Sequence, residues 1–387
     1  MKVLVELLEF QGFPGFVNTE IQEILFRALE GKELGHWQVE ELLNARGAAF
    51  HALMSVADFL RSKQVGNDVS FVVNRNINFT NICTKNCRFC FYSVPPGDTK
   101  AFMLSVKDIQ QKVREGLDKG ITEVCIQGGI APDVTLDTYL GILRAIKSVE
   151  GAESIHIHAF SPQEVKNASE SSGENITSVL RTLKENGLDS MPGTAAEILV
   201  DDVRRQICPN KVSSDEWISI IKTAHREGIK TTSTILYGHI ETGNDIYRHL
   251  QAIRGIQKDT GSITEFIPLS FISESKLERK LYRQSVDAML DLKLYAVSRI
   301  VLGDVIKNIQ ASWVKLGERL CQLALSCGCN DVGGTLMEES ISKEASGGRT
   351  KQQMSVDELL ALIRTGGRSP VQRTTDYLVL RRFSEAG

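Results

Sequence analysis

Short strand-forming runs alternate with longer amphipathic segments along most of the chain. The apolar, β-branched runs lie at residues 70–80, 122–127, 154–159, 188–191, 230–236 and 263–268, with weaker ones at 305–311 and 328–332. Apolar residues at helical spacing fill the intervals at 105–119, 135–148, 174–186, 213–227, 244–258, 282–301 and 312–326. This alternation predicts an α/β fold with a parallel sheet and crossover helices. About eight repeats favour a TIM-like (β/α) barrel over an open doubly wound sheet.

The two ends of the chain have other patterns. Residues 1–66 predict an N-terminal helical extension, residues 67–333 the barrel, and residues 334–387 a C-terminal helical segment and tail. No apolar run approaches the ~18 residues that span a bilayer. Acidic residues interrupt the apolar start, unlike a secretory signal. We therefore expect a cytoplasmic protein with no membrane span.

The charge balance excludes one class of partner. The chain has 45 Lys and Arg against 48 Asp and Glu, a formal net charge of −3. Sequence-independent binding to nucleic acid needs a strongly basic surface. We therefore expect no nucleic-acid partner.

Three of the eight cysteines form a compact motif. Cys83, Cys87 and Cys90 follow a predicted strand with Cys-x3-Cys-x2-Cys spacing. Zinc usually takes a fourth Cys or His nearby, and no second Cys-x2-Cys pair exists. Three thiolates instead leave one iron of a 4Fe–4S cluster without a protein ligand, where chemistry can occur. A zinc site in a structural protein, or three incidental cysteines, are the alternatives.

The cysteine motif, with Phe89 before its last cysteine, resembles the signature of the radical S-adenosylmethionine (SAM) superfamily. Flanking motifs narrow this resemblance, and they lie at 74–83, 127–132, 156–162, 193–198, 237–242 and 333–340. They are similar to a group that holds the deazaflavin (FO) synthase subunits, aminofutalosine synthase and dehypoxanthine futalosine cyclase. The tyrosine-using FO synthase subunits match best, over roughly residues 45–365.

This resemblance implies an activity and its partners. The three cysteines would hold a 4Fe–4S cluster, and SAM would chelate the open iron and yield a 5′-deoxyadenosyl radical. The radical would take hydrogen from L-tyrosine, whose Cα–Cβ bond then breaks. The 4-hydroxybenzyl group would add to C5 of 5-amino-6-(D-ribitylamino)uracil, which makes the enzyme an alkyl or aryl transferase. An electron donor such as ferredoxin or flavodoxin, and a second radical SAM subunit that takes the product, are also implied. The two futalosine enzymes, which act on menaquinone precursors, are the rival assignment.

Two glycines at the end of a predicted strand are candidate cofactor contacts. Gly128 and Gly129 suit a place where the backbone approaches another group closely. A plain turn is the alternative, but the neighbouring cysteine loop favours contact with the methionine amine. Superfamily members often have Glu after this Gly-Gly pair, whereas this chain has Ile130. Backbone carbonyls or another acid must then hold the amine.

Further cofactor contacts follow from the resemblance. Glu197 and Arg204 are seven residues apart, so they could share a helix face, where a surface ion pair is the simpler interpretation. By analogy with related barrels, Glu197 would contact the ribose and Arg204 the methionine carboxylate. Either Phe91 or Tyr92 would lie near the adenine, and Tyr92 is our candidate.

Two pairs of alternating residues are candidate catalytic groups. His156 and His158 lie two apart in a predicted strand and therefore face the same side. We expect that side to be the barrel interior, although core histidines or a zinc pair are alternatives. Tyr237 and His239 alternate where the strand at 230–236 ends, and barrel sites form at the C-terminal ends of strands. We predict that all four point into the cavity above the cluster and contact tyrosine or the pyrimidine.

Overall fold

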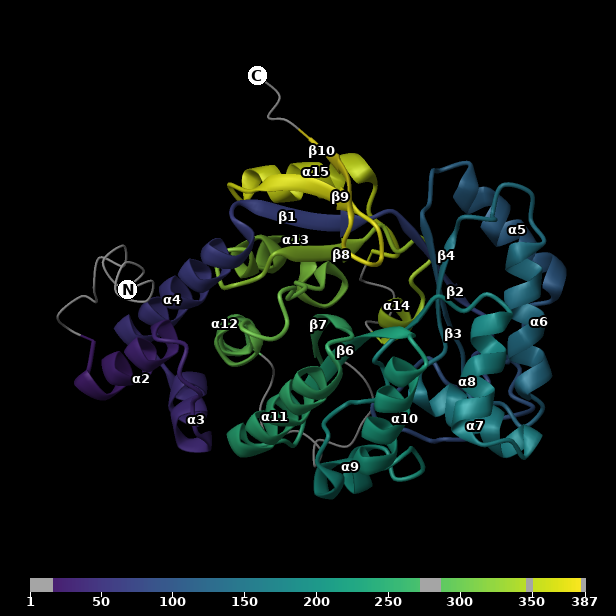
Figure 1. The fold of residues 1–387 in the computed structure, drawn as a ribbon, viewed down its shortest axis with the longest axis horizontal. Helices are drawn as coiled ribbons and strands as arrows, with labels where there is room; N and C mark the ends of the chain where they lie inside the picture. Colours follow the sequence, from purple (N-terminus) through teal and green to yellow (C-terminus); the bar gives the residue numbers. More distant parts are fainter. Residues whose placement is uncertain (1–16, 272–286, 346–350, 384–387) are drawn as a thin grey trace.

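Six parallel strands form the main sheet of the computed structural model, which describes residues 17–271, 287–345 and 351–383. They pair in chain order, each with its predecessor (Figure 1). The strands are β2 (Asn74–Asn78), β3 (Glu123–Gln127), β4 (His156–Ala159), β5 (Ser190–Met191), β6 (Lys230–Tyr237) and β7 (Ile263–Ser270). The predicted strands are therefore confirmed, and their sequential order requires crossover helices on one face.

Two further segments complete a ring of eight parallel positions. Isolated bridges join Phe266 to Ile309, and Gln310 to Asp331 at the start of β8 (Asp331–Gly334). A third bridge joins Met337 to Arg75 of β2. The weak runs at 305–311 and 328–332 thus occupy the seventh and eighth positions, and the TIM-like barrel is confirmed.

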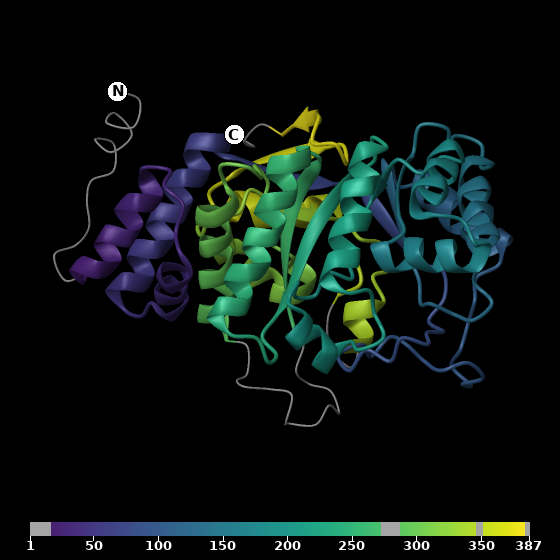
Figure 2. The ribbon, with the colours of Figure 1, turned by 60° about the horizontal axis from the view of Figure 1, so that its bottom comes forward.

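Helices cover the outside of this ring (Figures 1 and 2). They are α5 (Val106–Leu117), α6 (Leu136–Lys147), α7 (Pro162–Ser172), α8 (Ile176–Glu185), α9 (Asp201–Ile207), α10 (Ser214–Arg226), α11 (Gly243–Thr260), α12 (Ala288–Leu302) and α13 (Trp313–Ala324). Capping boxes begin several of them, for example at Ser105, Ser161 and Ser213. The sequence analysis missed α7 and α9, while residues 282–286 of one predicted helix lie outside the described residues.

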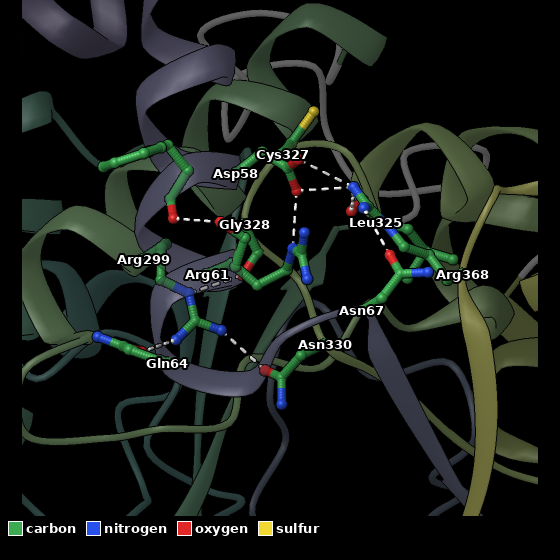
Figure 3. Close-up of polar contacts among 12 residues, drawn as sticks. Asp58, Arg61, Gln64, Asn67, Arg299, Leu325, Cys327, Gly328, Asn330 and Arg368 are labelled. Carbon is green, nitrogen blue, oxygen red and sulfur yellow. Dashed lines mark hydrogen bonds and ion pairs between the residues drawn. The ribbon is translucent and has the colours of Figure 1, made fainter. Parts of the chain in front are cut away.

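The N-terminal helices pack on one side of the barrel (Figure 2). They are α2 (Thr19–Leu29), α3 (His36–Asn44) and α4 (Ala48–Val65). A buried arginine of α12 joins them to the barrel (Figure 3). Arg299 donates to Gln64 Oε1 of α4 and to the Gly328 carbonyl, each at 2.7 Å, and to Asn330 Oδ1 at 2.7 Å. The first 16 residues, on which the predicted lack of a secretory signal depends, lie outside the described residues.

The C-terminal part differs from its prediction. Helices α14 (Ile341–Ala345) and α15 (Val356–Thr365) agree with it, but β9 (Ser369–Arg373) and β10 (Val379–Arg382) replace the expected tail. These strands join β1 (Asp68–Val72) and β8 in a second sheet of order β10-β9-β1-β8. The predicted run at 70–80 accordingly divides into β1 and β2. The division of the chain into three domains stays a prediction.

The described helices give no sign of a transmembrane segment. None of them is long and apolar enough to cross a membrane.

Candidate active site

A cavity of about 400 Å³ opens at the C-terminal ends of the barrel strands and continues into the barrel interior. Cys83, Cys87 and Cys90 line it, together with Gly128 and Gly129. The loop after β2 therefore shares one space with the ends of the neighbouring strands. This is the end of a barrel where active sites form.

Main-chain hydrogen bonds hold the cysteine loop in place. The Cys83 amide donates to the Val94 carbonyl at 3.0 Å, and the Arg88 amide donates to the Ile207 carbonyl at 2.8 Å. All three cysteines are free thiols, and burial raises the pKa of Cys87 to about 12. A metal would have to displace that proton, because thiolates are the ligands.

The donor set fits an iron–sulfur cluster. Three thiols from one loop face one cavity, and in a 4Fe–4S cluster each would bind a different iron. Among the residues that the structure describes, no three Cys, His, Asp or Glu side chains are arranged to hold a single metal ion.

The two glycines allow the cysteine loop to pack against β3. A Cβ on Gly129 would lie 2.1 Å from the Ile82 carbonyl oxygen and 3.0 Å from Cys83 Cβ. A Cβ on Gly128 would lie 2.3 Å from the Phe79 ring. The predicted close approach is therefore present, and the group that approaches is the cysteine loop itself. Contact of these glycines with methionine stays a prediction.

Glu164 is a cavity acid that the sequence analysis missed. It belongs to the capping box of α7, so its sequence signal indicated only a helix start. Its carboxylate accepts from the Gly128 amide at 3.1 Å and from the Ser161 amide at 2.6 Å. Burial raises the pKa of Glu164 to about 7. An acid thus lies beside the Gly-Gly pair although Ile130 occupies the usual position.

Glu197 lines the cavity and Arg204 does not. Glu197 accepts from Lys211 Nζ at 2.6 Å, and that ammonium lies 5.6 Å from the centre of the Phe89 ring. Arg204 is buried and donates to main-chain carbonyls, including Ala195 at 3.2 Å. The predicted placement of Arg204 is wrong because Glu197 precedes α9, so seven residues do not amount to two helical turns.

Tyr92 lies in the cavity wall next to the cysteines. Its hydroxyl is buried without a hydrogen-bond partner among the described residues. Burial raises the pKa of Tyr92, with further contributions from Cys90 and Glu339. Tyr92 therefore presents an unpaired polar group to the cavity.

His156 and His158 face the barrel interior, as predicted. Both rings contact the Ser190 hydroxyl, at 2.7 Å from His156 Nε2 and 2.7 Å from His158 Nδ1. Their partners on β3, Glu123 and Cys125, line the cavity. His158 also lines it, but His156 does not. The prediction that His156 points into the cavity is wrong because His156 begins β4, at the end of the strand away from the cysteines. Burial lowers the pKa of His158 to about 4, so this ring is neutral at pH 7.

Tyr237 and His239 lie outside the cavity, and their predicted placement is wrong. Thr232, Thr234 and Leu236 are the β6 residues that line it. Tyr237 has the opposite parity, so its hydroxyl meets Asp291 of α12 in the helix layer. His239 follows the strand, and its Nε2 donates to the Leu236 carbonyl at 3.0 Å.

The deep end of the cavity contains charged residues from the C-terminal segment. Arg373 and Thr375 line it, which no sequence signal indicated. Arg373 donates to Asp331 at 2.6 Å, and the Thr375 hydroxyl donates to Glu123 at 2.6 Å. Glu265 also lines this end, and burial raises its pKa to about 7. These contacts close the interior at the end opposite the cysteines.

Solved structures support the fold. A crystal structure of HydG, a maturase of the [FeFe]-hydrogenase, matches with a TM-score of 0.72 at 15% identity, covering 97% of this chain and 80% of that one. Methylornithine synthase (PylB) matches with a TM-score of 0.66 at 17% identity, covering 89% of this chain and 95% of the other.

Sequence comparisons are more specific. Residues 77–253 match the radical SAM superfamily, and residues 259–385 match the CofH/MqnC C-terminal region. A 5-amino-6-(D-ribitylamino)uracil–L-tyrosine 4-hydroxyphenyl transferase of Methanococcus maripaludis (strain C6) is 49% identical over 86% of this chain and 93% of its own length. The enzyme with that name from Archaeoglobus fulgidus is 51% identical over 84% of this chain and 92% of its own. The chain therefore belongs to the family of 5-amino-6-(D-ribitylamino)uracil–L-tyrosine 4-hydroxyphenyl transferases, within the radical SAM superfamily.

Proposed function

We propose that the protein cleaves L-tyrosine at Cα–Cβ and transfers the 4-hydroxybenzyl group to C5 of 5-amino-6-(D-ribitylamino)uracil, in FO biosynthesis. One observation carries this proposal: the three-cysteine loop opens onto the same barrel cavity as a set of polar groups that have no partner among the described residues. The names of the relatives supply the two substrates. The futalosine enzymes are not favoured, since these relatives have the transferase name.

The cysteine loop is the proposed cofactor site. Cys83, Cys87 and Cys90 would hold the 4Fe–4S cluster, which with bound SAM supplies a 5′-deoxyadenosyl radical. Glu164 would accept from the methionine ammonium, since it is the acid beside Gly128. An ionised Glu164 is needed for that contact, because only the anion attracts an ammonium group.

The adenosine would bind between the cysteine loop and the end of β5. Phe89 and Glu197 line the cavity there, and Lys211 links them through its ring contact and ion pair. Glu197 would contact the ribose hydroxyls, for which a carboxylate is a strong acceptor. Tyr92 remains a candidate for the adenine, with a free hydroxyl to offer.

The pyrimidine substrate would bind deeper, along β2 and β4. The side-chain oxygens of Asn76 and Asn78 are buried without partners among the described residues, and both asparagines line the cavity. Unpaired buried acceptors are costly, so a ligand rich in N–H and O–H groups would satisfy them. His158, fixed by Ser190, would contact tyrosine or the pyrimidine.

The closed deep end of the cavity also suits radical chemistry. The C-terminal segment covers the deep end, where Arg373 pairs with Asp331 and Thr375 with Glu123. Exclusion of water keeps a reactive intermediate from side reactions.

Three further parts of the proposal concern the protein's surroundings. A ferredoxin or flavodoxin would deliver the electron, and a second radical SAM subunit would take the product. The protein would be located in the cytoplasm, since thiol ligands need a reducing compartment.

The experiment is product analysis after anaerobic reconstitution with iron and sulfide. Mass spectrometry should detect 5′-deoxyadenosine and the hydroxybenzyl adduct from tyrosine, SAM and ribitylaminouracil under reductant. Turnover with a purine-bearing menaquinone precursor instead would favour a futalosine enzyme. A colourless protein that binds one zinc would favour the structural alternative and end the proposal.

A further inference from the structure

Lys315 is a half-buried cation of the cavity wall, and it has no partner among the residues that the structure describes. It lies in the first turn of α13, just after the seventh position of the barrel. Within the described part of the chain, its ammonium makes neither a side-chain hydrogen bond nor an ion pair. The neighbouring cations differ, since Lys211 pairs with Glu197 and Arg373 with Asp331. Lys85 belongs to the cysteine loop itself.

Glu339 provides an opposite charge on the adjacent wall. It follows β8, is 7% exposed and lines the same cavity. The Ser342 amide donates to both of its oxygens, at 3.1 and 3.0 Å, and fixes the carboxylate. Burial lowers the pKa of Lys315, and Glu339 is the main charge that opposes this effect. The two groups influence each other without forming an ion pair.

The ring order places this pair away from the proposed SAM contacts. Gly128, Glu164 and Glu197 follow β3, β4 and β5, on one side of β2 in the sheet. Lys315 and Glu339 follow the seventh and eighth positions, on the other side of β2. The cysteine loop, which follows β2, therefore lies between two polar sites.

We propose that Lys315 and Glu339 bind the zwitterionic head of L-tyrosine. Lys315 donates to the α-carboxylate, and Glu339 accepts from the α-ammonium. Val314 and Leu336, which also line the cavity, offer apolar contacts for the phenol ring. This inference rests on the proposed function and adds the residues that would recognise the amino acid.

The methionine end of SAM has the same α-amino-acid chemistry, so it is the competing ligand. Its ammonium already has a candidate partner in Glu164, beside the glycines that pack against Cys83. Two amino-acid heads need two sets of opposite charges. The pair formed by Lys315 and Glu339 supplies the second set.

The test uses the reconstituted holoenzyme with Lys315→Met and Glu339→Gln. Equilibrium dialysis measures binding of L-tyrosine, tyramine, which lacks the carboxylate, and 3-(4-hydroxyphenyl)propionate, which lacks the amine. Lys315→Met should weaken tyrosine binding about 10- to 100-fold, as the loss of a charged hydrogen bond does, and leave tyramine binding unchanged. Glu339→Gln should weaken tyrosine binding and leave that of the propionate unchanged. Lys315→Arg should restore part of the affinity.

Matched measurements separate this inference from the proposed function. Lys222→Met, which removes an exposed lysine paired with Asp259, should change nothing. Iron content and SAM affinity should stay at the wild-type level in all variants. Unchanged tyrosine binding in Lys315→Met, or weaker SAM binding instead, would overturn the inference. If Lys315→Met does not load iron, Lys315→Arg and Glu339→Gln decide the matter by the same criteria. A wild-type protein that forms no adduct with tyrosine would refute the proposed function instead.

Discussion

Gly129→Ala tests whether the cysteine loop depends on its contact with β3. The added Cβ would lie 2.1 Å from the Ile82 carbonyl oxygen, whereas an ordinary contact begins near 3.4 Å. One of the two backbones must therefore move by about 1.3 Å. Gly129, just beyond β3, also donates to the Thr80 carbonyl at 2.9 Å just beyond β2, so the main chain at Gly129 is held in place and the loop at Ile82 is the part that must shift.

The expected damage is larger for the cluster than for the fold. Overpacking costs about 1–3 kcal/mol of folding free energy, which a barrel of this size tolerates. Ligand positions, in contrast, must be held within about 0.5 Å. A shift of the Cys83 backbone exceeds that limit, so we expect most of the bound iron and of the turnover to be lost.

The assay compares iron content, urea unfolding and 5′-deoxyadenosine formation for Gly129→Ala and a control. Gly141→Ala is that control, since no atom lies within 4 Å of its Cβ position in α6. It should load iron normally and gain about 0.5–1 kcal/mol of stability from the helix preference of alanine. If Gly129→Ala also binds iron like the wild type, the contact does not position the loop.

Three further predictions test the residue assignments. Cys87→Ala should remove most of the bound iron and all turnover, whereas Cys329→Ala, a change at a cysteine buried in the core, should keep the cluster. The iron content of the two variants tests this, and an active Cys87→Ala protein would contradict the ligand assignment. Tyr237→Phe should retain turnover and lower the free energy of unfolding by about 1–3 kcal/mol, because buried Asp291 loses its hydrogen-bond donor. Loss of product formation with unchanged stability would contradict the placement of Tyr237 in the helix layer. In the wild type, SAM binding should tighten as the pH rises through about 7, the pKa of Glu164, since only the ionised carboxylate attracts the ammonium. Glu164→Gln should bind SAM more weakly and without this pH dependence in calorimetry, and a persistent dependence would refute the assignment.

The sequence predicted most of the barrel strands because runs such as β6 and β7 contain β-branched residues and are followed or preceded by an amphipathic helical pattern. It predicted the inward side of β4 because His156 and His158 alternate with apolar Ile157 and Ala159. In β6 this contrast is missing, since Thr231, Ser233 and their neighbours are polar on both faces. The sequence therefore predicted correctly that side chains alternate between the two faces of β6, but it could not show which face Tyr237 belongs to.

Other misses have tertiary causes. Residues 369–373 contain Pro370 and only one other apolar side chain, that of Val371, so nothing local favours a strand. Pairing with β1 supplies the missing hydrogen bonds, as in the contact of Asp68 with Ser369. Glu164 was missed for a related reason. Its place in a capping box accounts for a glutamate at this position, so the sequence offered no reason to assign it to a binding site. Such residues become functional candidates only when the fold brings them to the cavity.

The two ends of the cavity differ in how their charges are satisfied. At the deep end, Arg373 is bound to Asp331, and Glu123 accepts from Asn74 and Thr375. A buried charge without a partner is costly, so these contacts stabilise the closed end and leave little for a ligand. Near the cysteines, Lys315 has no hydrogen bond among the described residues, and the Tyr92 hydroxyl is unpaired. Unpaired polar groups thus lie around the proposed cluster, and those of Asn76 and Asn78 continue along β2 between the two ends. A ligand would have to supply the partners that the chain does not.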